Sequence, residues 1–228
     1  MTLVQYMAVG SVVVGICSDT RQVVSGKLFG IDVKFRHEDT EEKSGNLSNY
    51  VLFGGGGLNS PVDRVKELIA EYADGAQTLD GIVPAFKKAI ETMRYEKKHK
   101  KYVKDPGCFQ VLIGGFTNDG HTGRAVFTSG KNAEVEYEIH EYFQDDTTAL
   151  TPSDDELEIV IESLKTVESA PSPEVMVGHF ARVQKACFLN DDTNVSEKSV
   201  YTVIYRDPNT HEFKFYKGTI DLLEGSMK

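Results

Sequence analysis

The stretch GSVVVGICSDTR (residues 10–21) reads as one buried strand that ends at an acidic residue. Residues 12–16 form an apolar, largely β-branched run, which is typical of a strand covered on both faces. Asp19 comes at the end of this run and is followed by Thr20 and Arg21. An acid at a strand end can pair with a base inside a site, or it can cap a turn. Both interpretations stay open at this point.

A second apolar segment leads directly into a run of glycines. Residues 50–53 (YVLF) predict a short strand, residues 54–57 are all glycine, and Ser60-Pro61 predicts a helix with Ser60 as its N-cap. Backbone N–H groups between a strand and a helix can hold an anion or an oxyanion. Alternatively, the glycines form a tight turn in which backbones pack closely. The run lacks the Gly-Lys-Ser/Thr of a Walker A loop, and Asn59 replaces the third glycine of a dinucleotide fingerprint.

The rest of the chain alternates between strand and helix patterns. We expect further helices to begin near Thr78, Ser153 and Ser172, and residues 37–46 to form a polar hairpin loop. Further strands are predicted within residues 22–35 (two short pieces), 109–116, 124–128, 135–142, 199–206 and 212–220. No Pro-rich or Ser-rich linker divides the chain, so residues 1–228 are expected to form a single domain with helix pairs packed on sheets.

Composition and charge narrow the class of protein. The net charge is −10, so the surface repels phosphate backbones and we expect no nucleic-acid partner. The basic run at residues 94–104 is interpreted as a solvated helix end. The N-terminus lacks the basic region of a signal peptide, and its apolar run is too short to span a bilayer. The sequence thus predicts a cytoplasmic protein without a membrane anchor.

Two residues near the start of the chain could take part in catalysis. Removal of the initiator Met would leave Thr2 with a free amine beside its hydroxyl, which is a known nucleophile arrangement. Lys34 lies on a predicted strand. Buried with a lowered pKa, it would accept a proton; exposed, it would pack its stem along the surface and keep its amine in water. The histidines and three cysteines show no metal-ligand spacing, so we predict neither a metal nor a cofactor.

In this order, the segments resemble the proteasome β-subunits and their bacterial ATP-dependent protease relatives, within the N-terminal nucleophile (Ntn) hydrolase superfamily. Residues 10–26 are similar to the family's glycine, apolar strand and Asp-Ser-Arg stretch, which here reads Asp-Thr-Arg. Residues 30–35 resemble the segment that carries the catalytic lysine, and residues 50–60 the strand and glycine loop of the oxyanion hole. Residues 172–205 resemble the last helix and the strand that follows it.

The resemblance implies an α+β fold, a four-layer αββα sandwich, and a threonine-type peptidase that cleaves peptide or other amide bonds. It also implies a homo-oligomer, because family members assemble in rings. The terminal amine of the nucleophile would relay protons, the lysine would lower the basicity of the site, and a glycine N–H would stabilise the oxyanion. The implied catalytic residues are Thr2, Asp19, Lys34, Gly56, Asp192 and Ser196.

The sequence also departs from the family pattern. The segment between Gly10 and Asp19 is longer, and TALTPS (residues 148–153) replaces a Gly-Ser-Gly. A retained Met1 would block the nucleophile. A second hypothesis is therefore a non-catalytic assembly or binding subunit that keeps the fold. A third is a small-molecule or anion-binding protein that uses the glycine run and Arg21.

Overall fold

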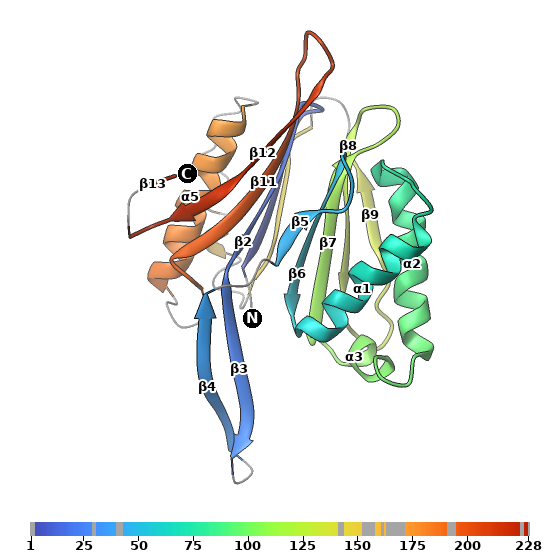
Figure 1. Cartoon of the computed structure of the whole chain (residues 1–228), viewed down its shortest axis with the longest axis vertical. Coiled ribbons are helices and arrows are strands. Elements are labelled where there is room, and N and C mark those ends of the chain that lie inside the picture. The colour runs from blue at the N-terminus through green and yellow to red at the C-terminus, as the bar shows by residue number, and fades with distance from the viewer. Residues whose placement is uncertain are drawn as a thin grey trace.

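The chain folds into two large antiparallel sheets, one separate two-stranded hairpin and helices packed on the sheets, as Figure 1 shows. The structure is a computed structural model that describes residues 3–28, 31–39, 43–140, 144–151, 158–160, 162, 172–190, 195–223 and 226–227. For residues 22–28, 31–39 and 226–227 it describes the backbone alone. The predicted α+β class is confirmed.

The first sheet contains the strand on which the sequence analysis is centred. Its strand order is β10-β1-β2-β11-β12-β13, and all neighbouring strands are antiparallel. Strand β2 lies in the middle and is buried along its whole length, as its apolar run predicts. The strands are β1 (Val4–Val9), β2 (Val13–Asp19), β10 (Asp146–Leu150), β11 (Lys198–Arg206), β12 (Phe213–Asp221) and β13 (Ser226–Met227).

The second sheet has the order β5-β6-β7-β8-β9, again with antiparallel neighbours. Its strands are β5 (Ser44–Asn46), β6 (Val51–Gly57), β7 (Phe109–Phe116), β8 (Thr122–Thr128) and β9 (Glu136–Ile139). The hairpin of β3 (Arg21–Leu28) and β4 (Ile31–Asp39) pairs within itself and projects from the body of the molecule (Figure 1).

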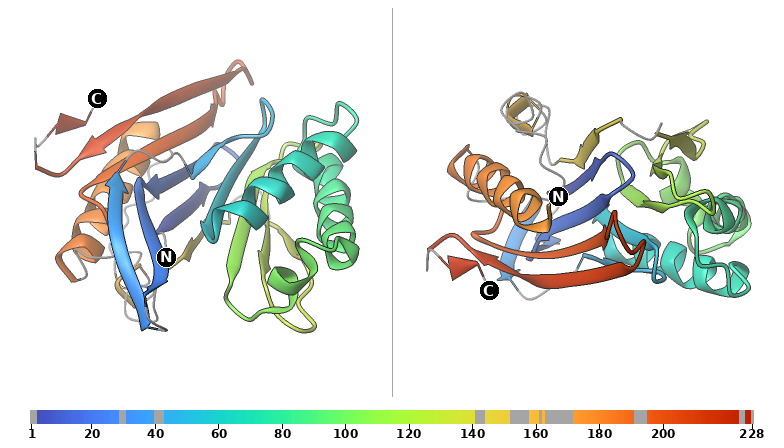
Figure 2. Two further views of the ribbon diagram at one scale, coloured as in Figure 1. Left: turned by 60° about the horizontal axis from the view of Figure 1, so that its bottom comes forward. Right: turned by 90° about the horizontal axis from the view of Figure 1, so that it is seen from above.

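The helices cover the outer faces of the two sheets. Figure 2, seen from above, shows α5 (Pro173–Asn190) on the first sheet and α1 (Asn59–Tyr72) and α2 (Leu79–Tyr95) at the opposite end of the molecule. A short helix, α3 (Lys100–Lys104), follows α2. The predicted apolar face of α2 is confirmed, since its members are all buried: Ile82, Val83, Phe86, Ile90 and Met93.

Of the four apolar clusters among the described residues, three join the sheets and helices. One joins α1 and α2 to the second sheet and includes Phe86 and Phe109. Another lies between the two sheets, where Tyr6 and Ile16 meet Leu112. The third packs α5 on the first sheet around Phe180. Successive side chains of a strand point to opposite faces, so each sheet contributes residues to one cluster between the sheets and to another beneath its helices.

The glycine run is part of strand β6, so the predicted turn between strand and helix is wrong. β6 continues through Gly57, and Gly56 pairs with Gln110 on β7. A Cβ atom on Gly54 would lie 2.6 Å from side-chain atoms of Val4 and Ile16 in the first sheet. A Cβ on Gly55 would lie 2.2 Å from Val62 on α1. Glycine is therefore required because two layers approach this strand from opposite sides.

This packing predicts a large cost for a single methyl group in β6. Gly54→Ala is expected to lower the free energy of unfolding by roughly 1–3 kcal/mol, because the new methyl overlaps Val4 and Ile16 between the sheets. Chemical denaturation measures the change. Gly45→Ala is the matched control, since an added Cβ there meets no described atom within 4 Å. If both variants lost the same stability, close packing would not be the reason for Gly54.

Other predicted boundaries also need correction. Helix α1 begins at Asn59 with Leu58 as N-cap, so Ser60 lies inside the helix and does not cap it. The predicted loop at residues 37–46 is partly strand, because β4 runs to Asp39 and β5 begins at Ser44. Strand β10 was not predicted; its polar residues gave no apolar pattern, and it forms by pairing with β1. The predicted helix near Ser153 lies largely outside the described residues.

Within the described ranges, none of the helices combines the length and the apolar character that a bilayer-spanning segment needs.

Candidate functional site

The candidate site is centred on Asp19, at the end of the buried strand β2. The side chain of Asp19 is fully buried. Its backbone N–H donates to the carbonyl of Leu3 at 3.0 Å, so the beginning of the described chain lies beside this residue. One carboxylate oxygen accepts a hydrogen bond from the backbone N–H of Ser196 at 3.4 Å. The first interpretation of Asp19, an acid that pairs within a site, is the one that fits.

The cationic partner of Asp19 is Lys43, which the sequence analysis did not single out. The Nζ atom of Lys43 lies 3.4 Å from Oδ1 of Asp19, and its side chain is only 7% exposed. The same amine donates to the backbone carbonyl of Arg21. The carbonyl of Lys43 accepts a hydrogen bond from Gly55 N–H at 2.9 Å. A single residue thus connects the buried acid to the glycine strand.

Burial has the largest effect on the pKa of Asp19. Removal from water raises the pKa of Asp19 from 3.8 to about 7. The positive charge of Lys43 and the hydrogen bond from Ser196 act in the opposite direction and lower the pKa by less. Asp19 therefore changes its charge near neutral pH, which is the range where such a group can control a reaction.

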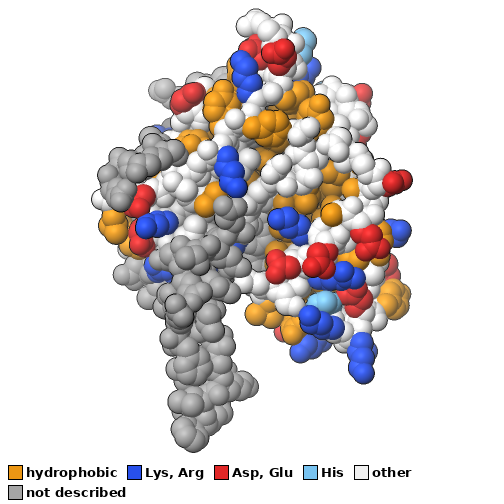
Figure 3. All heavy atoms as spheres, in the orientation of Figure 1, with side chains coloured by type: hydrophobic (Ala, Val, Ile, Leu, Met, Phe, Trp, Pro, Cys, Tyr) orange, Lys and Arg blue, Asp and Glu red, His pale blue; other side chains and the backbone are white. Residues whose placement is uncertain are grey.

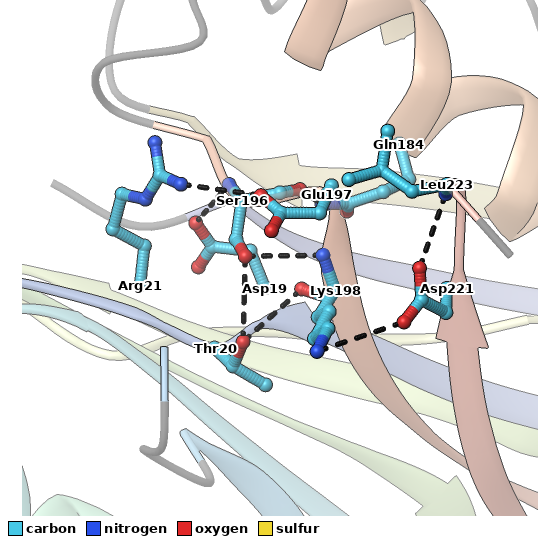
Figure 4. A network of polar contacts seen from close by, with 9 residues as sticks. All are labelled: Asp19, Thr20, Arg21, Gln184, Ser196, Glu197, Lys198, Asp221 and Leu223. Carbon is cyan, nitrogen blue, oxygen red and sulfur yellow. Dashed lines mark hydrogen bonds and ion pairs between the residues drawn. The ribbon is translucent and has the colours of Figure 1, made fainter. Parts of the chain in front are cut away.

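Ser196 connects Asp19 to the start of β11. Its side chain is fully buried, and its Oγ accepts a hydrogen bond from the backbone N–H of Lys198 at 3.0 Å. The Oγ also lies 3.5 Å from the hydroxyl of Thr20, as Figure 4 shows. Gln184 on α5 donates to the Ser196 carbonyl. Helix α5 and strand β11 therefore hold the loop that contacts the buried acid.

A further hydrogen bond and an ion pair lie around the Asp19–Lys43 pair. The hydroxyls of Ser18 on β2 and Ser44 on β5 lie 2.8 Å apart, which joins the two sheets next to Lys43. Arg21, which the anion-binding hypothesis used, forms an ion pair with Glu197 at 3.3 Å (Figure 4). Its guanidinium is thus engaged by an acid of the same chain.

Beside the pair lies a small cavity of about 40 Å³ between β6 and α1. Lys43 lines it together with the last three glycines of β6. Lys66 also lines it, and its amine lies 5.6 Å from the centroid of the Phe53 ring. About three water-sized groups fit into this volume. Two lysines, one acid (Asp63) and the glycine backbone border this space, so its lining is polar and of mixed charge.

The structure brings together some of the predicted site residues. Asp19 and Ser196 are in contact, and Gly56 lines the cavity that Lys43 borders. Thr2 and Asp192 lie outside the described residues. The backbone of Lys34 pairs with Ser25 in the projecting hairpin, and its side chain is outside the description. In the described part of the chain, no three His, Cys, Asp or Glu side chains gather as a metal site.

Comparisons with known proteins identify the fold. No protein-family model matches the sequence, and no curated protein matches it. Among solved structures, the chain is similar to a Gly-1 mutant of Anbu from Hyphomicrobium sp. strain MC1. The TM-score is 0.65 and the identity 10%, and the match covers 97% of this chain and 87% of that chain. At this identity the likeness shows a shared fold.

Proposed function

We propose that this chain is a proteasome-like N-terminal threonine hydrolase that cleaves peptide or other amide bonds. The observation that carries the proposal is the buried Asp19–Lys43 pair, which lies beside both the start of the chain and the glycine strand. Thr2 precedes Leu3 by one peptide bond, about 3.8 Å between Cα atoms, and the Leu3 carbonyl is bonded to Asp19. The residue that follows the proposed nucleophile is therefore hydrogen-bonded to the acid of a buried acid–amine pair.

The proposed reaction uses groups of four residues: Thr2, Asp19, Lys43 and Gly56. After removal of Met1, the Thr2 hydroxyl attacks the substrate carbonyl, and its proton passes to the terminal amine. The ammonium of Lys43 favours the neutral terminal amine as proton acceptor, and Asp19 holds that ammonium in place. The resemblance assigns the oxyanion to the N–H of Gly56, a contribution of about 3 kcal/mol for such donors, and this N–H would have to leave its strand pair with Gln110 to do so. Collapse transfers the proton to the leaving amine, and water then hydrolyses the acyl ester.

The choice of lysine is part of the proposal. Lys34 and Lys43 are both candidates for the catalytic amine, and Lys43 is supported by its contact with Asp19 and by the cavity it borders. Lys34 pairs with Ser25 on the hairpin, four residues along β3 from Arg21, or about 13 Å of extended chain. Ser196, and Asp192 from the segment just before it, would orient the terminal amine.

We further propose the four-layer αββα arrangement and a homo-oligomeric assembly. Three apolar clusters support the layers: one between α5 and the first sheet, one between the sheets, and one beneath α1 and α2. The likeness to Anbu supports both proposals at the level of the fold.

A second candidate function is a non-catalytic assembly or binding subunit. The full burial of Asp19 and the 7% exposure of Lys43 favour it, because a pair this enclosed can serve the fold alone. The cavity of about 40 Å³ beside the pair leaves little space for a substrate. This candidate predicts that no substitution at the pair changes any turnover.

Intact-mass measurement and peptide turnover together test the hydrolase. We expect the purified chain to begin at Thr2, to cleave fluorogenic peptides, and to lose at least about 100-fold in rate in Thr2→Ala, because the nucleophile is absent. Thr2→Ser keeps a hydroxyl and is the matched control, expected to retain measurable turnover. A chain that retains Met1 and shows no turnover with a broad peptide library would support the non-catalytic candidate instead.

A further inference from the structure

Three Asp-Gly pairs occur in the chain, at residues 74–75, 80–81 and 119–120. An Asp-Gly pair can rearrange without an enzyme, because the backbone nitrogen of the glycine can attack the side-chain carboxyl of the aspartate. Glycine is the most permissive residue for this step, since it has no side chain that hinders the approach. Whether a given pair reacts in the folded protein therefore depends on how the structure holds its glycine.

The first pair forms the turn between α1 and α2. Asp74 has a φ of 46° and Gly75 a φ of 78°, and the N–H of Ala76 donates to the carbonyl of Ala73 at 2.8 Å. Positive φ at both central residues is the pattern of a type I′ turn. The closing hydrogen bond of such a turn uses the N–H of its fourth residue, which leaves the N–H of Gly75 outside that bond. Within the described part of the chain, no acceptor is bonded to it.

This turn is also open to solvent. Asp74 and Gly75 are both exposed, and a Cβ atom on Gly75 would meet no described atom within 4 Å. Charged side chains of both signs lie on the surface over α1 and α2, on the right of Figure 3. The backbone of the turn can therefore rotate without displacing a packed neighbour. Rotation also releases Asp74 from a positive φ, which L residues rarely adopt.

In the other two pairs the N–H of the glycine is hydrogen-bonded. Gly81 donates to the carbonyl of Thr78 at 3.1 Å, at the start of α2. Gly120 donates to the carbonyl of Thr117 at 3.0 Å. The guanidinium of Arg206 covers Gly120 as well, since a Cβ atom there would lie 2.6 Å from Nη1. A bonded N–H cannot lose its proton and turn towards the aspartate until that hydrogen bond opens.

We propose that Asp74 is a modification site, which isomerises to isoaspartate through a succinimide formed with Gly75. The nitrogen of Gly75 gives up its proton and forms a bond to Cγ of the protonated carboxyl, and the hydroxyl leaves with that proton as water. Water then adds to one of the two ring carbonyls and opens the ring. Opening at the former backbone carbonyl leaves Gly75 linked through Cγ, which is isoaspartate, and restores the original mass. The inference does not depend on the proposed hydrolase activity.

The product changes the connection between two helices. Isoaspartate adds a carbon atom to the backbone of the turn and leaves a free carboxylate on Cα. Ala73 and Ala76, at the two ends of the turn, pack against the apolar cluster beneath α1 and α2. The lengthened backbone has to fit between these two packed residues. We therefore expect the isoaspartyl form, once separated, to unfold at a lower denaturant concentration than the original chain.

Peptide mapping of the aged, folded protein tests the site. The full chain is incubated in mildly acidic buffer, where the carboxyl group can leave as water, and the three Asp-Gly peptides are compared. A carboxyl methyltransferase that accepts isoaspartate detects it, together with a changed chromatographic retention at unchanged mass. We expect the peptide with Asp74 to accumulate isoaspartate at least roughly 5-fold faster than the other two, the factor that corresponds to opening one hydrogen bond.

A denatured control separates the effect of structure from that of sequence. In concentrated urea the glycine N–H groups of all three pairs are bonded to solvent, so their rates should become similar.

Two asparagine variants give a second measurement by mass. In Asp74→Asn and in Asp119→Asn, attack by the glycine nitrogen expels ammonia, and hydrolysis of the ring leaves an acid in place of the amide. Asparagine also tolerates positive φ. In the folded chain, the first variant should lose its amide at least roughly 5-fold faster than the second.

The outcomes are distinct. Isoaspartate that forms mainly at Asp74 in the folded chain, and at similar rates in all three pairs in urea, supports the proposal. Equal rates in the three pairs of the folded chain overturn the role of the N–H of Gly75. An Asp74 that stays unmodified in the folded chain overturns the proposal itself, whether or not it reacts in urea.

Discussion

Lys43→Met is expected to lower the rate of peptide cleavage by about 100- to 10,000-fold, the range for loss of a group that governs proton transfer. The amine of Lys43 contacts the carboxylate of Asp19 and borders the cavity under the glycine strand. Methionine keeps the length and the apolar stem of the side chain but removes the charge. The measurement is kcat/KM with a fluorogenic peptide, together with a thermal unfolding curve for each variant.

Two further lysine variants test whether the loss of activity is specific to Lys43. Lys66→Met removes the other lysine that lines the cavity, an exposed one, and should keep most of the activity. Lys34→Met removes the lysine that the sequence resemblance favours. If Lys34→Met abolished turnover while Lys43→Met retained it, the assignment of the catalytic amine would be reversed. Equal activity in all three variants would favour the non-catalytic candidate.

The stability of the protein is expected to fall as pH rises from about 4 to about 7 through Asp19. Burial raises the pKa of Asp19 from 3.8 to about 7 in the folded chain. Between these values the folded state holds a proton that the unfolded state has released, so unfolding becomes easier as pH increases. Each pKa unit corresponds to about 1.4 kcal/mol, so the effect amounts to a few kcal/mol.

Asp19→Asn is the matched comparison, since it has the same shape and does not titrate. Chemical denaturation at about pH 4 and about pH 8, near the two ends of this titration range, gives the difference in free energy of unfolding. The wild-type value should fall relative to the variant between these conditions. If the wild-type chain instead gained stability over the variant with rising pH, Lys43 would outweigh burial and the pKa of Asp19 would be depressed.

Much of the fold could be predicted from local pattern. The apolar stripe of α2 and the β-branched run of β2 were sufficient to predict these two elements, because each pattern reflects a face that must be buried. The glycines of β6 were misinterpreted because glycine has no strand preference of its own. Their strand conformation follows from pairing with β7, where Gly56 lies opposite Gln110, a residue distant in sequence. Polar strand β10 likewise depends on its partner β1.

The candidate site was predictable only in part. Asp19 and Ser196 were identified from the family resemblance, and their contact is present. Lys43 was missed because it stands in a polar stretch that reads as a loop, and no local signal separates a buried lysine from a solvated one. Its burial follows from the Ser18–Ser44 contact and the Gly55 hydrogen bond, which join segments that only the tertiary fold brings together.

The hydrogen bond between Leu3 and Asp19 has a consequence for the affinity with which the protein could bind a ligand near this segment. The chain start is already immobilised at Leu3 by the central strand, with a fully buried side chain. The conformational entropy of this segment is thus lost once, when the chain folds, and not again at each encounter. A terminus anchored in this way is preorganised, and loosening it would weaken binding even if every contact in the complex were kept.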